Sequence, residues 1–122
     1  MGAVLREIVV DCRDPDRVAS FWAGVLGWEV HENGEARWMS ASGAPFPDMP
    51  VVFVRVPEEK SVKNRVHLDV SPVGCDRYEE VARLIGLGAR PVDVGQGEQP
   101  WVVLADPEGN EFCVLGRRAD IL

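Results

Sequence analysis

The alternation of hydrophobic and polar positions predicts that the chain opens with a half-buried strand and an amphipathic helix. Residues 4–12 alternate between apolar and mixed positions, as expected for a strand with one covered face. Asp14-Pro15 predicts the helix start, with the aspartate as N-cap and the proline at the first helical position. Gly27 predicts its end, and its apolar stripe is Val18, Phe21, Trp22, Val25 and Leu26. Three shorter strands are expected near residues 28–31, 36–42 and 50–56.

The second half of the chain repeats this pattern. Val66, Leu68 and Val70 form the apolar side of a strand that begins near residue 64. A helix is expected near residues 75–86, with a buried side formed by Tyr78, Val81, Ala82 and Ile85. Strands near 89–94 and 99–105 then lead through the turn at residues 106–110 to a last strand over 111–116.

The spacing of the two halves indicates an internal repeat. Glu7 and His67, the polar residues on the two opening strands, are 60 positions apart, and the helix ends Leu26-Gly27 and Leu87-Gly88 are 61 apart. The chain of 122 residues is too short for two independent domains. We therefore expect one α+β domain, residues 1–122, built from two βαβββ modules at about 1–60 and 61–122 that form one cleft.

Strand alternation also predicts which residues face away from the helices. If the continuous apolar positions face the helices, the opposite face carries Glu7, His67, Asp69 and Cys113. The same argument on residues 50–56 places Phe53 and Arg55 on that open face. Trp38 and Trp101 are candidates for a flat platform under an aromatic ligand, with packing in the core or a dimer interface as the alternative.

Composition and charge exclude several classes of function. The net charge of −7 and the pI near 4.8 argue against nucleic acid as a partner, because nucleic-acid binding needs clustered Lys and Arg. No apolar run approaches the length of a membrane helix, and the strand pattern near the start predicts a mature chain that begins at Met1. Three cysteines without a CxxC spacing favour reduced thiols and a cytoplasmic location.

Four motifs give the chain a resemblance to a known superfamily. They are Asp11-Cys12-Arg13-Asp14-Pro15, Phe21-Trp22 followed by Leu26-Gly27-Trp28, Val66-His67-Leu68-Asp69-Val70, and Asp106-Pro107-Glu108-Gly109-Asn110-Glu111-Phe112-Cys113. In order and spacing the chain resembles the vicinal oxygen chelate superfamily, which includes glyoxalases, bleomycin-resistance proteins and extradiol dioxygenases, and most of all its small glyoxalase-like branch. The resemblance implies paired βαβββ modules, a cupped mixed sheet with helices outside, and a homodimer.

The resemblance also implies positions for metal ligands. Metal-dependent members carry them on the first and last strands of each module, typically His or Gln and then Glu. By position these sites fall on Glu7, His67 and Cys113, and the 60-residue offset assigns the fourth to Phe53. A carboxylate, an imidazole and a thiolate are able to hold a divalent Zn, Fe, Mn or Ni ion, but phenylalanine is not a ligand.

The sequence leaves three functions open. The favoured one is a glyoxalase-like protein that binds a small organic molecule in the cup without needing a metal. The first alternative is a metal-dependent lyase, isomerase or dioxygenase that uses Glu7, His67 and Cys113. The second is a resistance protein that sequesters an aromatic drug without chemistry. In a metal-free site Glu7 and His67 are the candidate catalytic base and acid, with Asp69 orienting the imidazole.

Overall fold

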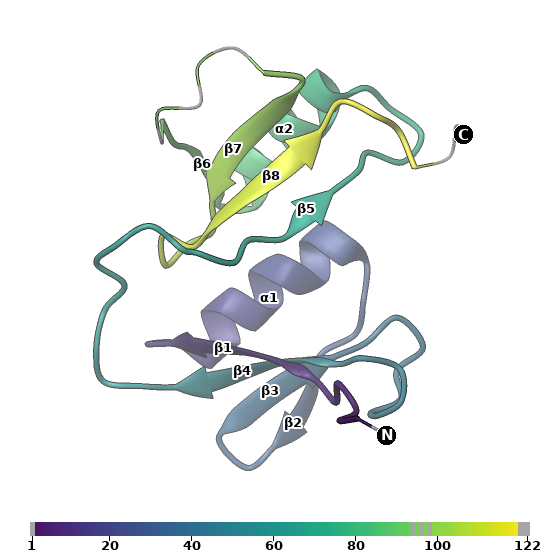
Figure 1. Cartoon of the computed structure of the whole chain (residues 1–122), viewed down its shortest axis with the longest axis vertical. Helices are drawn as coiled ribbons and strands as arrows, with labels where there is room; N and C mark the ends of the chain where they lie inside the picture. Colours follow the sequence, from purple (N-terminus) through teal and green to yellow (C-terminus); the bar gives the residue numbers. More distant parts are fainter. Residues whose placement is uncertain (1, 94, 96, 98, 120–122) are drawn as a thin grey trace. The chain divides into compact units, whose positions relative to one another are not determined.

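The chain forms two compact units, residues 1–59 and 60–122. A computed structural model describes residues 2–93, 95, 97 and 99–119. Each unit contains one helix and one four-stranded sheet in the order βαβββ (Figure 1). The predicted α+β class and the two βαβββ modules are therefore confirmed. None of the helices among these residues is long and apolar enough to cross a membrane.

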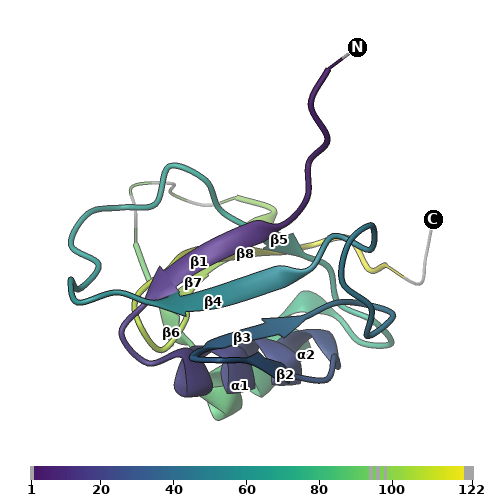
Figure 2. The same ribbon diagram turned by 90° about the horizontal axis from the view of Figure 1, so that it is seen from below.

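The first module is a mixed sheet with α1 packed on one face. Its elements are β1 (Ile8–Cys12), α1 (Pro15–Leu26), β2 (His31–Asn33), β3 (Ala36–Met39) and β4 (Val51–Arg55). The strand order is β1-β4-β3-β2, as Figure 2 shows from below. β1 and β4 are parallel, and the two other pairs are antiparallel.

Local sequence determines where α1 begins and ends. The Asp14 side chain accepts a hydrogen bond from the Arg17 backbone N–H at 3.2 Å, and Pro15 occupies the first turn. Gly27 ends the helix with φ 70°, a left-handed conformation that glycine adopts without strain. The predicted stripe packs against β3 and β4, with Val18 completely buried. The apolar period of the sequence therefore predicted the buried face of α1 correctly.

The register of β4 corrects the predicted positions of Phe53 and Arg55. Val10 of β1 is paired with Phe53, and Ile8 with Val51, so even positions of β1 share a face with odd positions of β4. That face is covered by α1, and Phe53 is only 1% exposed. Arg55 has the same parity and donates to the Arg13 carbonyl at 2.7 Å. The prediction that these two residues line the open face is wrong.

The second module has the same topology. Its elements are β5 (Asp69–Val70), α2 (Arg77–Leu87), β6 (Arg90–Pro91), β7 (Trp101–Ala105) and β8 (Glu111–Leu115), in the sheet order β5-β8-β7-β6. Residue 94, in the predicted strand 89–94, lies outside the described residues. Both opening strands are shorter than predicted, so Glu7 lies just before β1 and His67 two residues before β5.

The buried face of α2 differs from the predicted stripe. Tyr78 and Ile85 are exposed, whereas Glu80 and Leu84 are buried. The Arg83 guanidinium donates to both carboxylate oxygens of Glu80, at 2.7 and 2.9 Å. This pairing compensates the carboxylate for its loss of water, so a charged residue occupies a position that apolar periodicity assigns to the surface.

Candidate functional site

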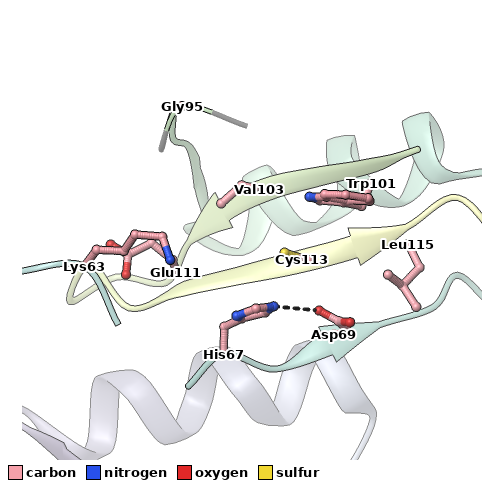
Figure 3. A pocket seen from close by; sticks show the side chains of 9 residues that line it. All are labelled: Lys63, His67, Asp69, Gly95, Trp101, Val103, Glu111, Cys113 and Leu115. Atoms are coloured by element: carbon pink, nitrogen blue, oxygen red, sulfur yellow. Dashed lines mark ion pairs between the residues drawn. The ribbon is translucent and has the colours of Figure 1, made fainter. Parts of the chain in front are cut away.

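The open face of the second sheet carries a pocket with a volume of about 470 Å³ (Figure 3). His67 and Asp69 lie at its edge, and Trp101 lies over the same face of the sheet. The pocket is lined by Lys63, His67, Asp69, Gly95, Trp101, Val103, Glu111, Cys113 and Leu115. A concave surface with apolar walls and a few convergent polar groups is the usual form of a small-molecule site.

Strand pairing explains why these residues share one face. Asp69 is paired with Cys113, Val103 with Cys113, and Trp101 with Leu115. Directly paired residues point to the same side of a sheet, and side chains alternate along each strand. The intervening residues Phe112 and Val114 are at most 1% exposed on the opposite, helix-covered side. The sequence prediction that Asp69 and Cys113 share an open face agrees with this register.

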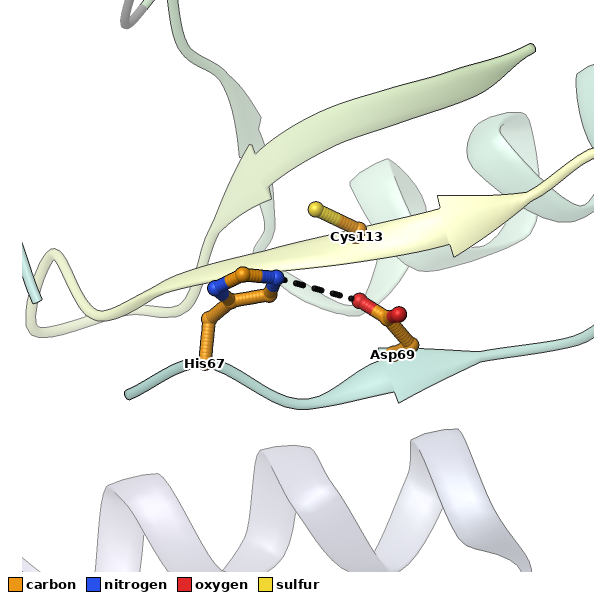
Figure 4. A group of neighbouring side chains, drawn as sticks. All are labelled: His67, Asp69 and Cys113. Atoms are coloured by element: carbon orange, nitrogen blue, oxygen red, sulfur yellow. Dashed lines mark ion pairs between the residues drawn. The ribbon is translucent and has the colours of Figure 1, made fainter. Parts of the chain in front are cut away.

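Three possible metal ligands meet in this pocket. One donor atom each from His67, Asp69 and Cys113 lies within 4.8 Å of the others (Figure 4). His67 Nε2 is 3.3 Å from Asp69 Oδ1, and both side chains are close to half exposed. The Cys113 residue is only 8% exposed. The sequence analysis treated Asp69 as a group that orients the imidazole, and the structure places its carboxylate equally near the thiol.

Cys113 is a protonated thiol in these surroundings. Burial raises the pKa of Cys113 above its ordinary value, and the charge and hydrogen bonding of Asp69 raise that pKa further. The more distant positive charge of Lys63 opposes these effects without cancelling them. The arrangement is therefore unfavourable for a free thiolate nucleophile at neutral pH.

Glu111 is held at the other end of the pocket by two donors. Its carboxylate accepts a hydrogen bond from Lys60 Nζ at 2.8 Å and one from the Asn64 backbone N–H at 2.7 Å. Burial alone raises the pKa of Glu111, but the hydrogen bonds from Asn64 and Lys60 outweigh it and leave the pKa below its ordinary value. This ion pair attaches residues 60–64 to β8 beside the pocket.

The lowered pKa of Glu111 predicts a pH-dependent contribution to stability. A carboxylate with a lower pKa in the folded state stabilises fully above its unfolded pKa, about 4.5, and loses this effect as the pH falls through the folded value. Glu111→Gln is therefore expected to lower the free energy of unfolding at about pH 7 and much less at about pH 3. Urea titrations at both pH values measure the difference, with exposed Glu58→Gln as control. An equal loss at both values contradicts the prediction.

The first module presents a different open face. Val9, Val52 and Trp38 are paired across β1, β4 and β3, on the side away from α1. Trp38 stacks on His31 with ring centroids 4.4 Å apart and planes 24° apart. Nε2 of His31 is buried and has no hydrogen-bond partner within the described part of the chain. Sequence analysis had expected His31 on an exposed turn, and the short strand β2 places it against Trp38 instead.

The pocket of module two therefore contains only some of the predicted site residues. It brings together His67, Asp69, Trp101 and Cys113. Glu7 and Trp38 belong to the first module, where Glu7 is exposed. The pairing of Glu7 with His67 joins the two modules and stays a prediction. The analysis missed Val103, Glu111 and Leu115, although they have the same parity as Trp101 and Cys113 along β7 and β8.

The fold and this open-faced sheet define a class of small-molecule-binding proteins built from paired βαβββ modules. Residues 7–115 match the model of the glyoxalase-like domain. The chain therefore belongs to the glyoxalase-like domain family, within the vicinal oxygen chelate superfamily that its motifs indicated. A search of curated proteins finds no match.

Solved structures share the fold at low sequence identity. A glyoxalase/bleomycin resistance protein/dioxygenase family enzyme from Burkholderia phytofirmans PsJN has a TM-score of 0.68 at 17% identity, covering 92% of this chain and 97% of that one. The fosfomycin resistance protein FosX from Mesorhizobium loti has a TM-score of 0.67 at 16% identity, covering 98% of both chains. FosX from Listeria monocytogenes, complexed with Mn(II) and sulfate, has a TM-score of 0.69 at 12% identity, covering 98% and 97%.

The ligand pattern of metal-dependent superfamily members does not fit this chain. Asp69 is paired with Cys113 in module two, and Val9 is paired with Val52 in module one. Val52, rather than Phe53, is therefore the counterpart of Cys113, because the offset between the last strands is 61 residues. Valine has no donor atom. A site with ligands on the first and last strands of both modules lacks one of its four donors.

Proposed function

We propose that this protein binds a small organic molecule in the pocket on the open face of β5, β7 and β8. The observation that carries the proposal is the combination of apolar and polar groups around a volume of about 470 Å³. Val103 and Leu115 supply apolar contacts, and the half-exposed pair of His67 and Asp69 supplies polar ones. A pocket of this size suits a drug-sized or smaller ligand.

Trp101 is proposed as the aromatic platform of this site. It is half-buried on the same sheet face as Cys113 and Leu115, so its ring is accessible to a molecule in the pocket. Stacking on such a ring adds about 0.5–1.5 kcal/mol beyond the burial of apolar area. We therefore expect planar aromatic or heteroaromatic compounds to bind better than aliphatic ones of equal size.

A fragment screen by NMR tests the proposal. The metal-free protein, labelled with ¹⁵N, is titrated with a library of aromatic and aliphatic fragments. Aromatic fragments are expected to shift the amide resonances of Trp101, Val103, Cys113 and Leu115. Trp101→Ala is expected to weaken binding about tenfold, the equivalent of about 1.4 kcal/mol. Trp38→Ala is the matched control and leaves the affinity unchanged; fragments that bind only elsewhere contradict the proposal.

A second candidate function is acid–base catalysis on the bound molecule. The specific observation is the 3.3 Å contact between His67 Nε2 and Asp69 Oδ1, which orients the imidazole toward the pocket. His67 is then the proposed general acid or base, and Glu7 stays its proposed partner from module one. Lyase, isomerase and dioxygenase reactions are the classes that the superfamily suggests.

The fate of bound compounds distinguishes catalysis from sequestration. Compounds that bind are incubated with the protein and followed by ¹H NMR. Conversion that is lost in His67→Ala, a variant that still binds the compound, supports an enzyme. Quantitative recovery of unchanged compound from the wild-type complex supports a sequestering resistance protein. The glyoxalase-like binding function is compatible with either result.

We also propose that the protein is a cytoplasmic homodimer. Apolar side chains near the starts of the two opening strands are strongly exposed, including Val4 at 71%, Leu5 at 69% and Val66 at 82%. Such groups favour coverage by a second copy. Light scattering after size exclusion is expected to give twice the chain mass of 13.5 kDa. The monomer mass at micromolar concentrations contradicts the dimer. The three free cysteines support a reducing compartment.

A further inference from the structure

We propose that His67, Asp69 and Cys113 form a binding site for a soft divalent cation, Zn²⁺ above all, that is complete within the second module. The proposal differs from the superfamily pattern, whose ligands come from both modules. It shares the pocket of the proposed function but depends on no organic ligand.

The first support is the convergence of three different donor types. An imidazole nitrogen, a carboxylate oxygen and a sulfur lie within 4.8 Å of one another. A small contraction brings three such atoms to the separations found around one metal ion, since metal–ligand bonds to Zn²⁺ are about 2.0–2.3 Å long. The three residues come from two adjacent segments, β8 and the segment that leads into β5.

Strand pairing holds two of these donors in position. Asp69 and Cys113 are direct partners in the parallel ladder between β5 and β8, and the Cys113 N–H donates to the Leu68 carbonyl at 2.9 Å. His67 precedes Asp69 by two residues, which returns its side chain to the same face. The backbone thus limits how far the donors separate when no ion is bound, so little ordering remains for the ion to impose.

The surroundings suit a cation with an open coordination position. His67 and Asp69 are nearly half exposed and face the pocket, so an ion reaches them from solvent. Cys113 lies beneath them, between the apolar residues Val103 and Leu115. On ligation the thiol gives its proton to solvent. The thiolate and the Asp69 carboxylate then balance the two positive charges of the ion.

Donor chemistry determines which cation is expected. Thiolate and imidazole ligands favour Zn²⁺ over Mn²⁺ or Mg²⁺, which prefer oxygen. Three protein ligands leave the fourth tetrahedral position for water or for an oxygen of a bound molecule. We therefore expect binding of Zn²⁺ and Co²⁺ at one equivalent per chain, with Mn²⁺ markedly weaker.

Metal titration of the full chain tests the site without reference to activity. Metal-free protein is titrated with Zn²⁺ by calorimetry and with Co²⁺ by absorption spectroscopy, each metal alone. One Co²⁺ per chain with a thiolate-to-cobalt charge-transfer band in the near ultraviolet is expected. Cys113→Ser is expected to abolish the band, and His67→Ala and Asp69→Asn to weaken Zn²⁺ binding by more than about tenfold. Cys75→Ser is the matched thiol control and changes neither measurement.

Glu7→Gln separates this site from the one that spans both modules. The proposal expects Zn²⁺ affinity to be unchanged in Glu7→Gln and reduced in Asp69→Asn. The reverse pattern overturns it, as does the absence of stoichiometric Zn²⁺ binding or of the charge-transfer band. Circular dichroism confirms that each variant is folded before titration. Fragment binding by the metal-free protein is measured separately, so failure of the metal site leaves the proposed function intact, and the converse also holds.

Discussion

Phe53→Ala is expected to lower the free energy of unfolding by about 3–5 kcal/mol, the usual cost of truncating a fully buried phenylalanine. Phe53 is 1% exposed on the α1 side of β4, where Met39 and Val18 are completely buried. Its removal leaves a cavity in the first core that these neighbours fill only in part. Urea unfolding followed by circular dichroism measures the effect.

Val52→Ala is the matched control for the register of β4. Val52 is the adjacent residue, lies on the open face and is only partly buried. We expect it to cost about 1 kcal/mol or less, because truncation there leaves a smaller void and less lost burial. If Val52→Ala costs more than Phe53→Ala, the faces of β4 are the reverse of those described.

Asp106→Ala is expected to destabilise the chain by about 3 kcal/mol, because it leaves several turn donors without acceptors. The Asp106 carboxylate is 1% exposed. Its Oδ1 accepts from the backbone N–H groups of Glu108 and Asn110 at 2.9 and 3.0 Å, and its Oδ2 from Asn110 Nδ2 at 2.9 Å. These bonds shape the turn that connects β7 to β8, and so the strand that carries Cys113.

Asp93→Ala provides the comparison for Asp106→Ala. The exposed Asp93 accepts one backbone hydrogen bond, from Gly95 at 2.8 Å, and water replaces it when it is lost. Chemical denaturation is expected to show a clearly smaller loss for this variant. Asp106→Asn is expected to lie between the two, since its amide oxygen still accepts from the backbone. Similar losses in Asp93→Ala and Asp106→Ala contradict the role assigned to the turn.

Features that depend on neighbours in the chain were predictable from sequence. The N-cap at Asp14, the left-handed Gly27 and the turn after β7 follow from side-chain chemistry and local backbone conformation. The repeat then indicated two similar modules, and the motifs indicated the family. The alternation that placed Asp69 and Cys113 on one face was also correct, because both strands of that module pair in the predicted phase.

Features that depend on pairing between distant strands were less predictable. A slip of one residue between the repeats, 61 positions at the last strand instead of 60, moves every side chain of β4 to the other face. Phe53 therefore lies in the core, and Val52 takes its predicted place. The buried face of α2 moved in a similar way, because the Arg83 side chain pairs with the Glu80 carboxylate and makes its burial possible.

The sequence by itself determined the elements, their order, the two modules and the family, because caps, turns and apolar periods act over a few residues. Only the tertiary structure decided which side chains meet. The cross-strand register brought Asp69 beside Cys113 and His67, and it gave the first module a valine where the second has a thiol. Register depends on hydrogen bonds between strands more than 40 residues apart, and no local pattern encodes it to the single residue on which the site depends.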